Sequence, residues 1–489
     1  MTQNSEEQLI LPIDELAGAP GFRGIPRTRR VFCNRHLKMN TISWIGFDMD
    51  YTLAIYDQAA MDDLSIRATI DKLLQRGYPP FVKDVPHVTD YPVRGLLIDK
   101  RFGHVLKMDR YKFVSRGYHG FRELSRDELR TLYHAKKIRP ATARYHWIDT
   151  LYALSEVAVY AALVEAFESH GLAVDYSKLF TDIRESIDEA HRDGTILDAV
   201  LADLPRFLNR DKDLATTLHK FRSAGKRLFL LTNSRWSYTD KMMTYLLGGA
   251  MAEYPSWRNF FDLVICAARK PGFFEEDNPL MERDGEQVRV AKFPLERGRI
   301  YEGGNLHELE RALGVDGDEV LYVGDHIYGD ILRSKKESAW RTAMIMQELE
   351  TEILAHEECG ADYTYAERMD DLHDQLEDEL RFYQGRLKES LRKNSSDPAE
   401  TRRLKGAVER IRAKLRELNR EEDIVERRVA GRFHKYWGSL MKEESEQSSF
   451  GQQVEDYACV YTSRVSNFAL YSPQQTYRSH RDEMAHEIG

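Results

Sequence analysis

Cysteine is scarce in this chain of 489 residues: only Cys33, Cys266, Cys359 and Cys459 occur, and no two of them form a CxxC pair. This argues against a disulfide-stapled scaffold and favours a reducing compartment, so we expect a cytoplasmic protein. No apolar run approaches the roughly 20 residues that span a bilayer. The first twenty residues also lack the basic segment and apolar core of a signal peptide. We therefore expect no membrane association.

Excess positive charge is missing as well. Lys and Arg number 71 against 80 Asp and Glu, which gives a net charge of −9. The chain thus lacks the electrostatic footprint of a nucleic-acid-binding protein, and we expect no nucleic acid among its partners. Hydrophobic residues make up 42% and charged residues 31%, which is typical of a globular protein and not of a disordered chain. The length suggests about three domains.

The most informative stretch is an apolar run that ends in two aspartates. Residues 42–47 are rich in β-branched and aromatic side chains and predict a buried strand. Asp48 and Asp50 follow, and alternate residues of an extended chain share one face. We expect paired carboxylates at the carboxyl edge of a sheet, where open α/β sheets bind ligands. Such a pair repels itself unless a cation, a shared proton or a distinct task separates the two groups.

Three more strands are predicted after residue 226, and each ends in polar residues. Residues 227–231 precede Thr232, Asn233 and Ser234; residues 261–268 precede Lys270; and residues 319–324 precede Asp325 and Asp330. Helical patterns follow at least two of these strands, which indicates a parallel sheet with helices on its faces. The expected fold class is α/β, with a Rossmann-like parallel core.

Composition divides the chain into five parts. We predict an N-terminal arm at 1–40, a catalytic core at 41–57 and 210–365, an inserted α+β cap at 58–209, a helical hairpin at 366–445, and a tail at 446–489 that packs on the core or on a partner subunit. Within the cap, strands are expected around 93–114 and helices at 61–74, 147–166, 176–191 and 196–204, the last stopped by Pro205. The basic run 27–30 is expected on the surface. The apolar stripe of the hairpin requires burial by the parent domain or by another subunit.

The strand-end residues are those that phosphoryl transfer needs. A carboxylate can attack phosphorus and form an acyl phosphate, while a hydroxyl and a lysine hold the phosphoryl oxygens. A second acid protonates the leaving oxygen and then activates water. Mg²⁺ prefers carboxylate and carbonyl oxygens as ligands. Structural alternatives exist for each residue: a turn at Asp48 and Asp50, a surface position for Lys270, a helix cap at Asp330, and exposed ion pairs on the helix at 176–191.

The sequence Asp48-Met-Asp-Tyr-Thr52, with Thr232, Lys270 and Gly324-Asp325-x4-Asp330, resembles the four motifs of the haloacid dehalogenase superfamily. Neighbouring strings, among them Thr232-Asn-Ser234 and residues 324–332, are similar to the cytosolic purine 5'-nucleotidase family. The resemblance implies that Asp48 is the nucleophile and Asp50 the acid/base. It also implies that Mg²⁺ binds the Asp48 carboxylate, the Asp50 backbone carbonyl and Asp325, with Asp330 supporting the metal site.

The same resemblance implies a substrate. It points to hydrolysis of IMP- and GMP-type nucleoside 5'-monophosphates through an aspartyl phosphate, and to phosphate transfer onto a nucleoside. The residues implied in substrate binding are Thr52, Asn233, Ser234, Tyr152, Arg184, Asp188 and His191. The last three recur at i, i+4 and i+7 and so lie on one face of a helix. Three residues of the family's pocket are replaced here, by Ala153, Arg192 and Leu197.

A nucleotide effector site of the family is matched in part by Arg139, Tyr328 and Lys336, with Asp149 in place of an asparagine. We also expect a homo-oligomer, either a dimer or a tetramer. Two other functions fit the sequence. One is a phosphatase for a different phosphomonoester, since pocket residues are altered. The other is an assembly or scaffold protein that uses the hairpin to bind a partner.

Overall fold

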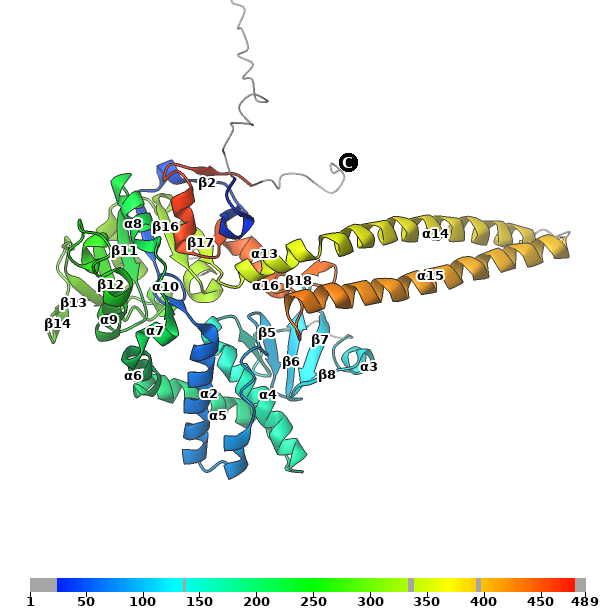
Figure 1. Cartoon of the computed structure of the whole chain (residues 1–489), viewed down its shortest axis with the longest axis horizontal. Helices are drawn as coiled ribbons and strands as arrows, with labels where there is room; N and C mark the ends of the chain where they lie inside the picture. The colour runs from blue at the N-terminus through cyan, green and yellow to red at the C-terminus, as the bar shows by residue number, and fades with distance from the viewer. Residues whose placement is uncertain (1–23, 135–137, 333–337, 393–396, 480–489) are drawn as a thin grey trace, which may run out of the picture.

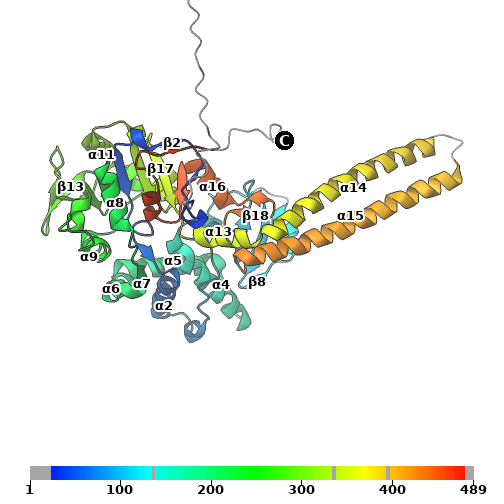
Figure 2. The ribbon, with the colours of Figure 1, turned by 45° about the horizontal axis from the view of Figure 1, so that its top comes forward.

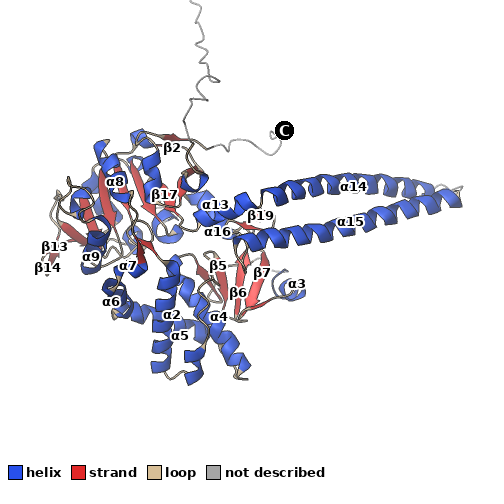
Figure 3. Ribbon diagram, in the orientation of Figure 1, coloured by secondary structure: helices blue, strands red, loops and turns tan. Residues whose placement is uncertain are grey.

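The computed structural model describes residues 24–134, 138–332, 338–392 and 397–479. Its core is a ten-stranded sheet in the order β1-β20-β17-β16-β3-β11-β12-β15-β13-β14 (Figures 1 and 3). The strands from β20 to β15 in this order run parallel, while β1, β13 and β14 are antiparallel to their neighbours. Their bounds are β1 Phe32–Cys33, β3 Trp44–Phe47, β11 Arg227–Leu231, β12 Leu263–Cys266, β13 Leu280–Asp284, β14 Gln287–Val290, β15 Ile300–Gly303, β16 Val320–Gly324, β17 Arg341–Ile345 and β20 Val460–Thr462. The predicted α/β class with a parallel core is confirmed.

Both faces of the central strand β3 are buried, which explains its continuous apolar run. On one face Ile45 and Phe47 join the core beneath helices α8 (Leu214–Ser223) and α9 (Trp236–Leu247). On the other face Trp44 packs in the cluster that includes α11 (Leu306–Leu313). Gly46 is required because a Cβ there would lie 2.1 Å from the Phe229 ring. The strand that presents Asp48 is therefore clamped from both sides.

The cap is joined to the core by two short strands that pair with each other. The chain leaves the core at β4 (Ile55–Tyr56) and returns at β10 (Leu208–Asn209), and the two strands are antiparallel. Between them, β5 Leu96–Asp99, β6 His104–Met108, β7 Val114–His119, β8 Arg122–Glu123 and β9 Tyr145–Ile148 form an antiparallel sheet in the order β8-β7-β6-β5-β9. The cap helices are α2 Gln58–Gln75, α3 Arg126–Leu129, α4 Leu154–Ser169, α5 Tyr176–Arg192, α6 Thr195–Ala202 and α7 Leu204–Phe207. In Figure 1 the cap lies below the core.

Two predicted cap helices differ from the structure. The prediction of a helix from residue 147 was wrong, because Trp147 pairs with Leu97 in β9 and the helix starts only at Leu154. Thr150 marks the change, since its Oγ1 accepts a hydrogen bond from the amide of Ala153 at 3.1 Å. Pro205 does not stop α6, which already ends at Ala202. It lies instead at the start of α7, where its missing N–H is no loss.

The hairpin projects from the body as two long helices, α14 (Gly360–Arg392) and α15 (Pro398–Phe433) (Figures 1 and 2). Asp397 caps α15 by accepting a hydrogen bond from the amide of Ala399 at 2.9 Å. The apolar stripes bury each other in a core of Met369, Leu376, Ile411, Leu418 and Val425. The short helix α13 (Leu349–Glu358) precedes the hairpin.

A buried ion pair fixes the segment after the hairpin to the cap sheet. Lys107 of β6 lies 2.7 Å from Glu443. Its Nζ also donates hydrogen bonds to the carbonyls of Trp437, Ser439 and Lys442 at 2.6–2.7 Å. The lysine therefore connects the cap to the segment that follows the hairpin.

The two ends of the described chain meet on the core. The tail strand β20 adds to β17 and pairs with β1, and β2 (Leu37–Lys38) pairs with β21 (Thr476–Tyr477). The tail also forms β18 Lys442–Glu443, β19 Glu446–Gln447 and α16 Ser449–Tyr457. Arg29 of the basic run lies on the surface and pairs with Asp213 at 2.9 Å. Among the described residues, no helix has both the length and the apolar character needed to cross a membrane.

Candidate active site

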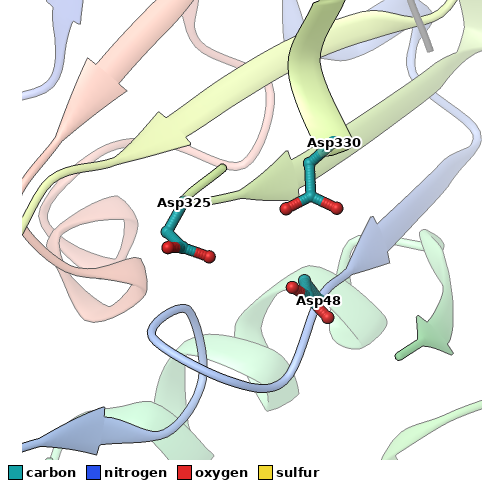
Figure 4. Close-up of side chains that lie close together, drawn as sticks. All are labelled: Asp48, Asp325 and Asp330. Atoms are coloured by element: carbon teal, nitrogen blue, oxygen red, sulfur yellow. The ribbon is translucent and has the colours of Figure 1, made fainter. Parts of the chain in front are cut away.

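Four neighbouring strands end at one place. Asp48 follows β3, Thr232 follows β11, Lys270 lies beyond β12 and Asp325 follows β16, and these strands stand side by side in the sheet. Figure 4 shows the side chains of Asp48, Asp325 and Asp330 turned toward one another. A carboxylate oxygen of each lies within 4.8 Å of the others. The strand-end residues that the sequence singled out are thus brought together.

Lys270 occupies the middle of this group. Its Nζ lies 2.9 Å from Asp48 Oδ1 and 2.6 Å from Asp330 Oδ1. It also donates a hydrogen bond to the hydroxyl of Tyr322 at 2.9 Å. The lysine is almost fully buried, so its charge acts in a region of low dielectric constant. It is therefore not the surface lysine that its sequence alone would also allow.

Asn233 holds the backbone of Lys270 from both sides. The amide Nδ2 donates to the Lys270 carbonyl at 2.9 Å, and the Lys270 N–H donates to Asn233 Oδ1 at 2.6 Å. This paired contact fixes where the lysine side chain starts. The resemblance implied a substrate contact for Asn233, whereas its side chain here grips the loop that carries Lys270.

Asp330 reaches the site because a glycine makes room for it. It lies in a short helical turn, Ile327–Leu332, directly after β16. A Cβ on Gly324 would lie 2.6 Å from the Cβ of Asp330, so any larger residue would displace the aspartate. The glycine of the Gly324-Asp325-x4-Asp330 motif therefore has a steric reason.

Asp50 has surroundings different from those of Asp48. Its two carboxylate oxygens accept hydrogen bonds from the hydroxyls of Tyr56, at 2.6 Å, and Ser234, at 2.7 Å. Tyr56 in turn contacts the hydroxyl of Tyr238 at 3.0 Å. Burial raises the pKa of Asp50 above its ordinary value, and the two hydrogen bonds only partly oppose this. The raised pKa favours the protonated form of the carboxyl group, which suits an acid/base.

The electrostatics of the cluster favour a cation. Burial raises the pKa of Asp48 well above its ordinary value; Lys270 opposes this rise, and the charges of Asp330 and Asp325 add to it. Burial alone would lower the pKa of Lys270, but the charges of Asp330 and Asp48 raise it well above its usual range. Three converging carboxylates thus face one lysine. A hard divalent cation such as Mg²⁺ fits this donor set.

The loop after β16 is held by a cap residue. The guanidinium of Arg94, which is fully buried, donates to the main-chain carbonyl of Asp325 at 2.8 Å. It also makes two hydrogen bonds of 2.7 Å to the carboxylate of Glu348. Burial raises the pKa of Asp325 to about 7, and the charge of Asp330 adds to this shift.

Two threonines complete the site. Thr232 is fully buried, and its Oγ1 accepts a hydrogen bond from the amide of Ser234 at 3.1 Å. Thr52 is equally buried, and its Oγ1 finds no hydrogen-bond partner among the described residues. A buried hydroxyl without a partner is unfavourable unless a ligand satisfies it.

The predicted cap residues form a second group. The rings of Tyr152 and His191 lie 4.2 Å apart, and the tyrosine hydroxyl is hydrogen-bonded to His191 Nδ1. Burial lowers the pKa of His191 to about 4, so this histidine is neutral at pH 7. Arg184 lies 3.4 Å from the buried carboxylate of Glu156, and Asp188 is exposed on the same helix.

The two groups are electrostatically connected. Burial is the main cause that raises the pKa of Tyr152. The charge of Asp50 is the second cause, and the charge of Asp188 adds to it. Burial raises the pKa of Glu156 to about 7; the charge of Arg184 opposes this rise and the charge of Asp188 adds to it. The structure thus brings Tyr152 and the helix that carries Arg184, Asp188 and His191 together beside the strand ends.

The predicted effector residues are only partly described. Arg139 is exposed in a loop, and Asp149 lies 3.3 Å from His326. The side chain of Tyr328 and the whole of Lys336 lie outside the described residues. The effector site therefore stays a prediction.

Four contributing residues were not found from the sequence: Tyr56, Arg94, Glu156 and Tyr322. Tyr56 and Tyr322 lie in apolar strands, so the sequence pattern predicts that they are ordinary core residues. Arg94 lies just before the apolar strand Leu96–Asp99, and Glu156 lies in the first turn of the apolar helix α4. A charged residue beside an apolar run is rarely buried without a partner, so this pattern could have marked both residues as candidates.

The chain is similar to two curated 5'-nucleotidase domain-containing proteins. A 5'-nucleotidase domain-containing protein of Dictyostelium discoideum is 28% identical over 474 residues, which cover 94% of this chain and 75% of that protein. The 5'-nucleotidase domain-containing protein 2 of Rattus norvegicus is 27% identical over 477 residues, covering 94% and 80%. Among solved structures, a predicted phosphoglycolate phosphatase from Haemophilus somnus matches with a TM-score of 0.28 and 12% identity, over 63% of this chain and 87% of that one.

A model of the 5' nucleotidase family matches residues 31–489, which include every predicted catalytic residue. The resemblance drawn from the motifs is therefore confirmed. The chain belongs to the 5' nucleotidase family.

Proposed function

We propose that this protein hydrolyses nucleoside 5'-monophosphates through a phosphoryl group carried on Asp48. The observation that carries the proposal is the position of Lys270, whose Nζ bridges Asp48 and Asp330 at 2.9 and 2.6 Å. A fixed cation beside a buried carboxylate suits attack on a phosphate dianion, because it offsets the negative charge that gathers there.

Each residue has a defined task in this proposal. An Asp48 oxygen attacks phosphorus, the bond from phosphorus to the ribose O5' breaks, and Asp50 gives its proton to that oxygen. Water then attacks the phosphoryl group, its proton returns to Asp50, and the Asp48–phosphorus bond breaks. The Tyr56 and Ser234 hydroxyls hold Asp50 in place for both transfers. The unpaired Thr52 hydroxyl is a candidate donor to a phosphoryl oxygen.

Mg²⁺ is proposed as the cofactor. Asp48, the main-chain carbonyl of Asp50 and Asp325 would hold it, with Asp330 alongside. The ion, when bound, supplies positive charge that offsets the repulsion between the substrate phosphate and the carboxylates. Chelation with EDTA is expected to abolish activity, and added Mg²⁺ is expected to restore it.

Purine monophosphates of the IMP and GMP type are the proposed substrates. The cap offers an aromatic ring, Tyr152, beside a neutral histidine, and charged groups on the α5 helix at Arg184 and Asp188. Such a set can stack on a base and hydrogen-bond its edge. Phosphate transfer to an added nucleoside belongs to the same proposal, since a phosphoryl group on Asp48 can be taken by an alcohol in place of water.

The test is phosphate release from a panel of nucleoside monophosphates, with glucose 6-phosphate as a non-nucleotide control. We expect release from IMP or GMP with Mg²⁺, no turnover by Asp48→Asn, and a raised KM for Asp188→Ala. Hydroxylamine should convert phosphorylated Asp48 into its hydroxamate, with release of phosphate, in the wild type only. If no nucleotide in the panel releases phosphate, the proposal is wrong. Equal rates on the control ester, unchanged by Asp188→Ala, would favour a phosphatase for another phosphomonoester.

A further inference from the structure

The hairpin is electrically divided along its length. In the half toward the tip, residues 380–392 and 398–416 carry eleven Arg and Lys against three Glu, a net charge of +8. In the half toward the body, residues 360–379 and 417–433 carry thirteen Asp and Glu against five Arg, a net charge of −8. The hairpin as a whole is therefore neutral, and the change of sign falls near the middle of both helices.

Ion pairs inside the hairpin do not neutralise this division. In the tip half, Arg386 pairs with Glu400 at 3.7 Å and Arg412 with Glu409 at 2.9 Å. Arg381 also pairs across the boundary with Asp378 at 2.8 Å. Three glutamates and this one aspartate cannot match eleven cations, so most of the positive charge in this half faces solvent or a partner. Like charges held close on one helix pair repel each other and destabilise it. An arrangement that costs stability in the isolated chain is explained if something else balances it.

Apolar side chains are exposed on both halves. Leu372 in the half toward the body is 45% exposed, and Phe382, just beyond the middle, is 62% exposed. Leu391 near the tip is 58% exposed. Figures 1 and 2 show most of the hairpin extending beyond the core and the cap, while its base meets the cap, where Asp423 of α15 pairs with Arg126 at 3.0 Å.

We propose that the hairpins of two copies of this chain pair side by side in opposite directions, with the basic tip of each against the acidic half of the other. A two-fold axis near the middle of the hairpin then places the +8 tip half of each copy against the −8 half of the other copy. It also places the two Phe382 rings close to the axis. Each helix is about 50 Å long at 1.5 Å per residue, which is long enough for a stable contact.

Opposite charge fixes the direction of this pairing. If the hairpins lay in the same direction, each +8 half would face the other +8 half and each −8 half the other −8 half. The two copies would then repel each other. The contact is isologous, because the same surface is used by both copies and the assembly closes at two. A nucleic acid could neutralise the tip, but it would leave the −8 half unexplained. The second copy accounts for both halves with one contact.

The experiment uses two variants of the full chain, in which three substitutions lower the charge of the tip half from +8 to +2 or that of the half toward the body from −8 to −2. The tip variant carries Lys405→Glu, Arg410→Glu and Lys414→Glu, and the base variant carries Asp370→Lys, Asp371→Lys and Asp374→Lys. All six side chains are exposed, so the hairpin core is left intact. Sedimentation velocity measures the mass of each variant, of the wild type and of a one-to-one mixture of the two variants.

We expect each variant alone to have half the mass of the wild type at about 50 mM salt, with at least a tenfold weaker association. The mixture is expected to contain more dimer than either variant alone, because one of its two contacts joins an unaltered +8 half to an unaltered −8 half. A variant with all six changes should associate most weakly, because its two halves carry only +2 and −2. Wild-type association should weaken as salt rises, since the Debye length falls from about 10 Å at 0.1 M to about 3 Å at 1 M.

Three results would overturn the proposal. One is an unchanged mass in both single variants. Another is a mixture with no more dimer than either variant alone, while circular dichroism and phosphate release show that both variants are folded. The third is nucleic acid that copurifies with the wild type and the base variant but not with the tip variant, which would make the tip a nucleic-acid-binding surface.

Discussion

The guanidinium of Arg94, a residue of the cap, donates a hydrogen bond to the main-chain carbonyl of Asp325, a residue of the core, at 2.8 Å. The same side chain forms a bidentate pair with Glu348 at the start of α13 and lies over the ring of Phe450 at 5.0 Å. One buried side chain thus connects the cap, the acidic cluster and the tail. Its loss should disturb the position of Asp325 even though it does not touch the substrate phosphate in the proposed mechanism.

Replacing Arg94 is expected to lower both stability and activity. Arg94→Met leaves Glu348 without its partner in a partly buried place, which costs about 3 kcal/mol of unfolding free energy. In the double variant Arg94→Met/Glu348→Gln the unpaired charge is gone, so thermal stability should return. Phosphate release should stay at least tenfold below wild type, with a higher Mg²⁺ concentration needed for half-maximal rate. Full activity of the double variant would show that Arg94 has a structural role only.

Asn233→Ala should change the position of Lys270 while leaving the lysine itself unaltered. The variant loses the two hydrogen bonds that hold the Lys270 backbone, so the lysine is presented less accurately to Asp48. We expect kcat to fall ten- to a hundredfold with a smaller change in KM. Asn419→Ala, an exposed change on α15, is the matched control. If KM alone rises, Asn233 contacts the substrate, as the family resemblance implied.

Tyr56→Phe removes one of the two donors to Asp50. The remaining donor, Ser234, holds one oxygen only, so we expect kcat to fall roughly fivefold, in line with about 1 kcal/mol for one hydrogen bond. Tyr238→Phe is the control, because it removes the contact to Tyr56 and leaves the Tyr56–Asp50 bond in place. Equal losses in the two variants would mean that the tyrosine pair, and not the bond to Asp50, matters.

Asp62 makes stability depend on pH. It is only 3% exposed, and burial raises its pKa to about 7 while Gln58 donates one opposing hydrogen bond. Between pH 4 and pH 7 the folded chain keeps this proton and the unfolded chain does not, so stability falls as pH rises through this window. Asp62→Asn should melt at the same temperature as wild type near pH 4 and several degrees higher at pH 8. A difference that does not grow with pH would contradict this assignment.

The sequence was a good guide to the strand ends and a poor one to what surrounds them. Asp48, Lys270 and Asp325 could be found because each follows an apolar strand, and parallel strands bring their carboxyl ends together. Tyr322 could not, since the residues around it are also buried and only the fold places its hydroxyl beside Lys270, fifty-two positions away. Arg94 and Glu348 are 254 positions apart and share no local pattern.

The same limit explains the error at Trp147. A short aromatic and apolar run fits either a strand or the start of a helix, and pairing with Leu97 decides for the strand. The hairpin, by contrast, was predictable because its stripe repeats over many turns and Asp397-Pro398 marks a helix start. Its division into a basic and an acidic half was present in the sequence but has meaning only once the two helices are placed side by side.

The pairing of β1 with β20 has a consequence for synthesis. Phe32 and Cys33 emerge early from the ribosome. Their partners Tyr461 and Val460 emerge only after more than four hundred further residues have been made. Until then the edge of β17 is open, because β20 is its neighbour in the finished sheet. An open parallel strand edge invites pairing with another chain. Nascent and truncated forms of this protein should therefore aggregate or require chaperones, and a fusion at the carboxyl end is safer than a cut before residue 462.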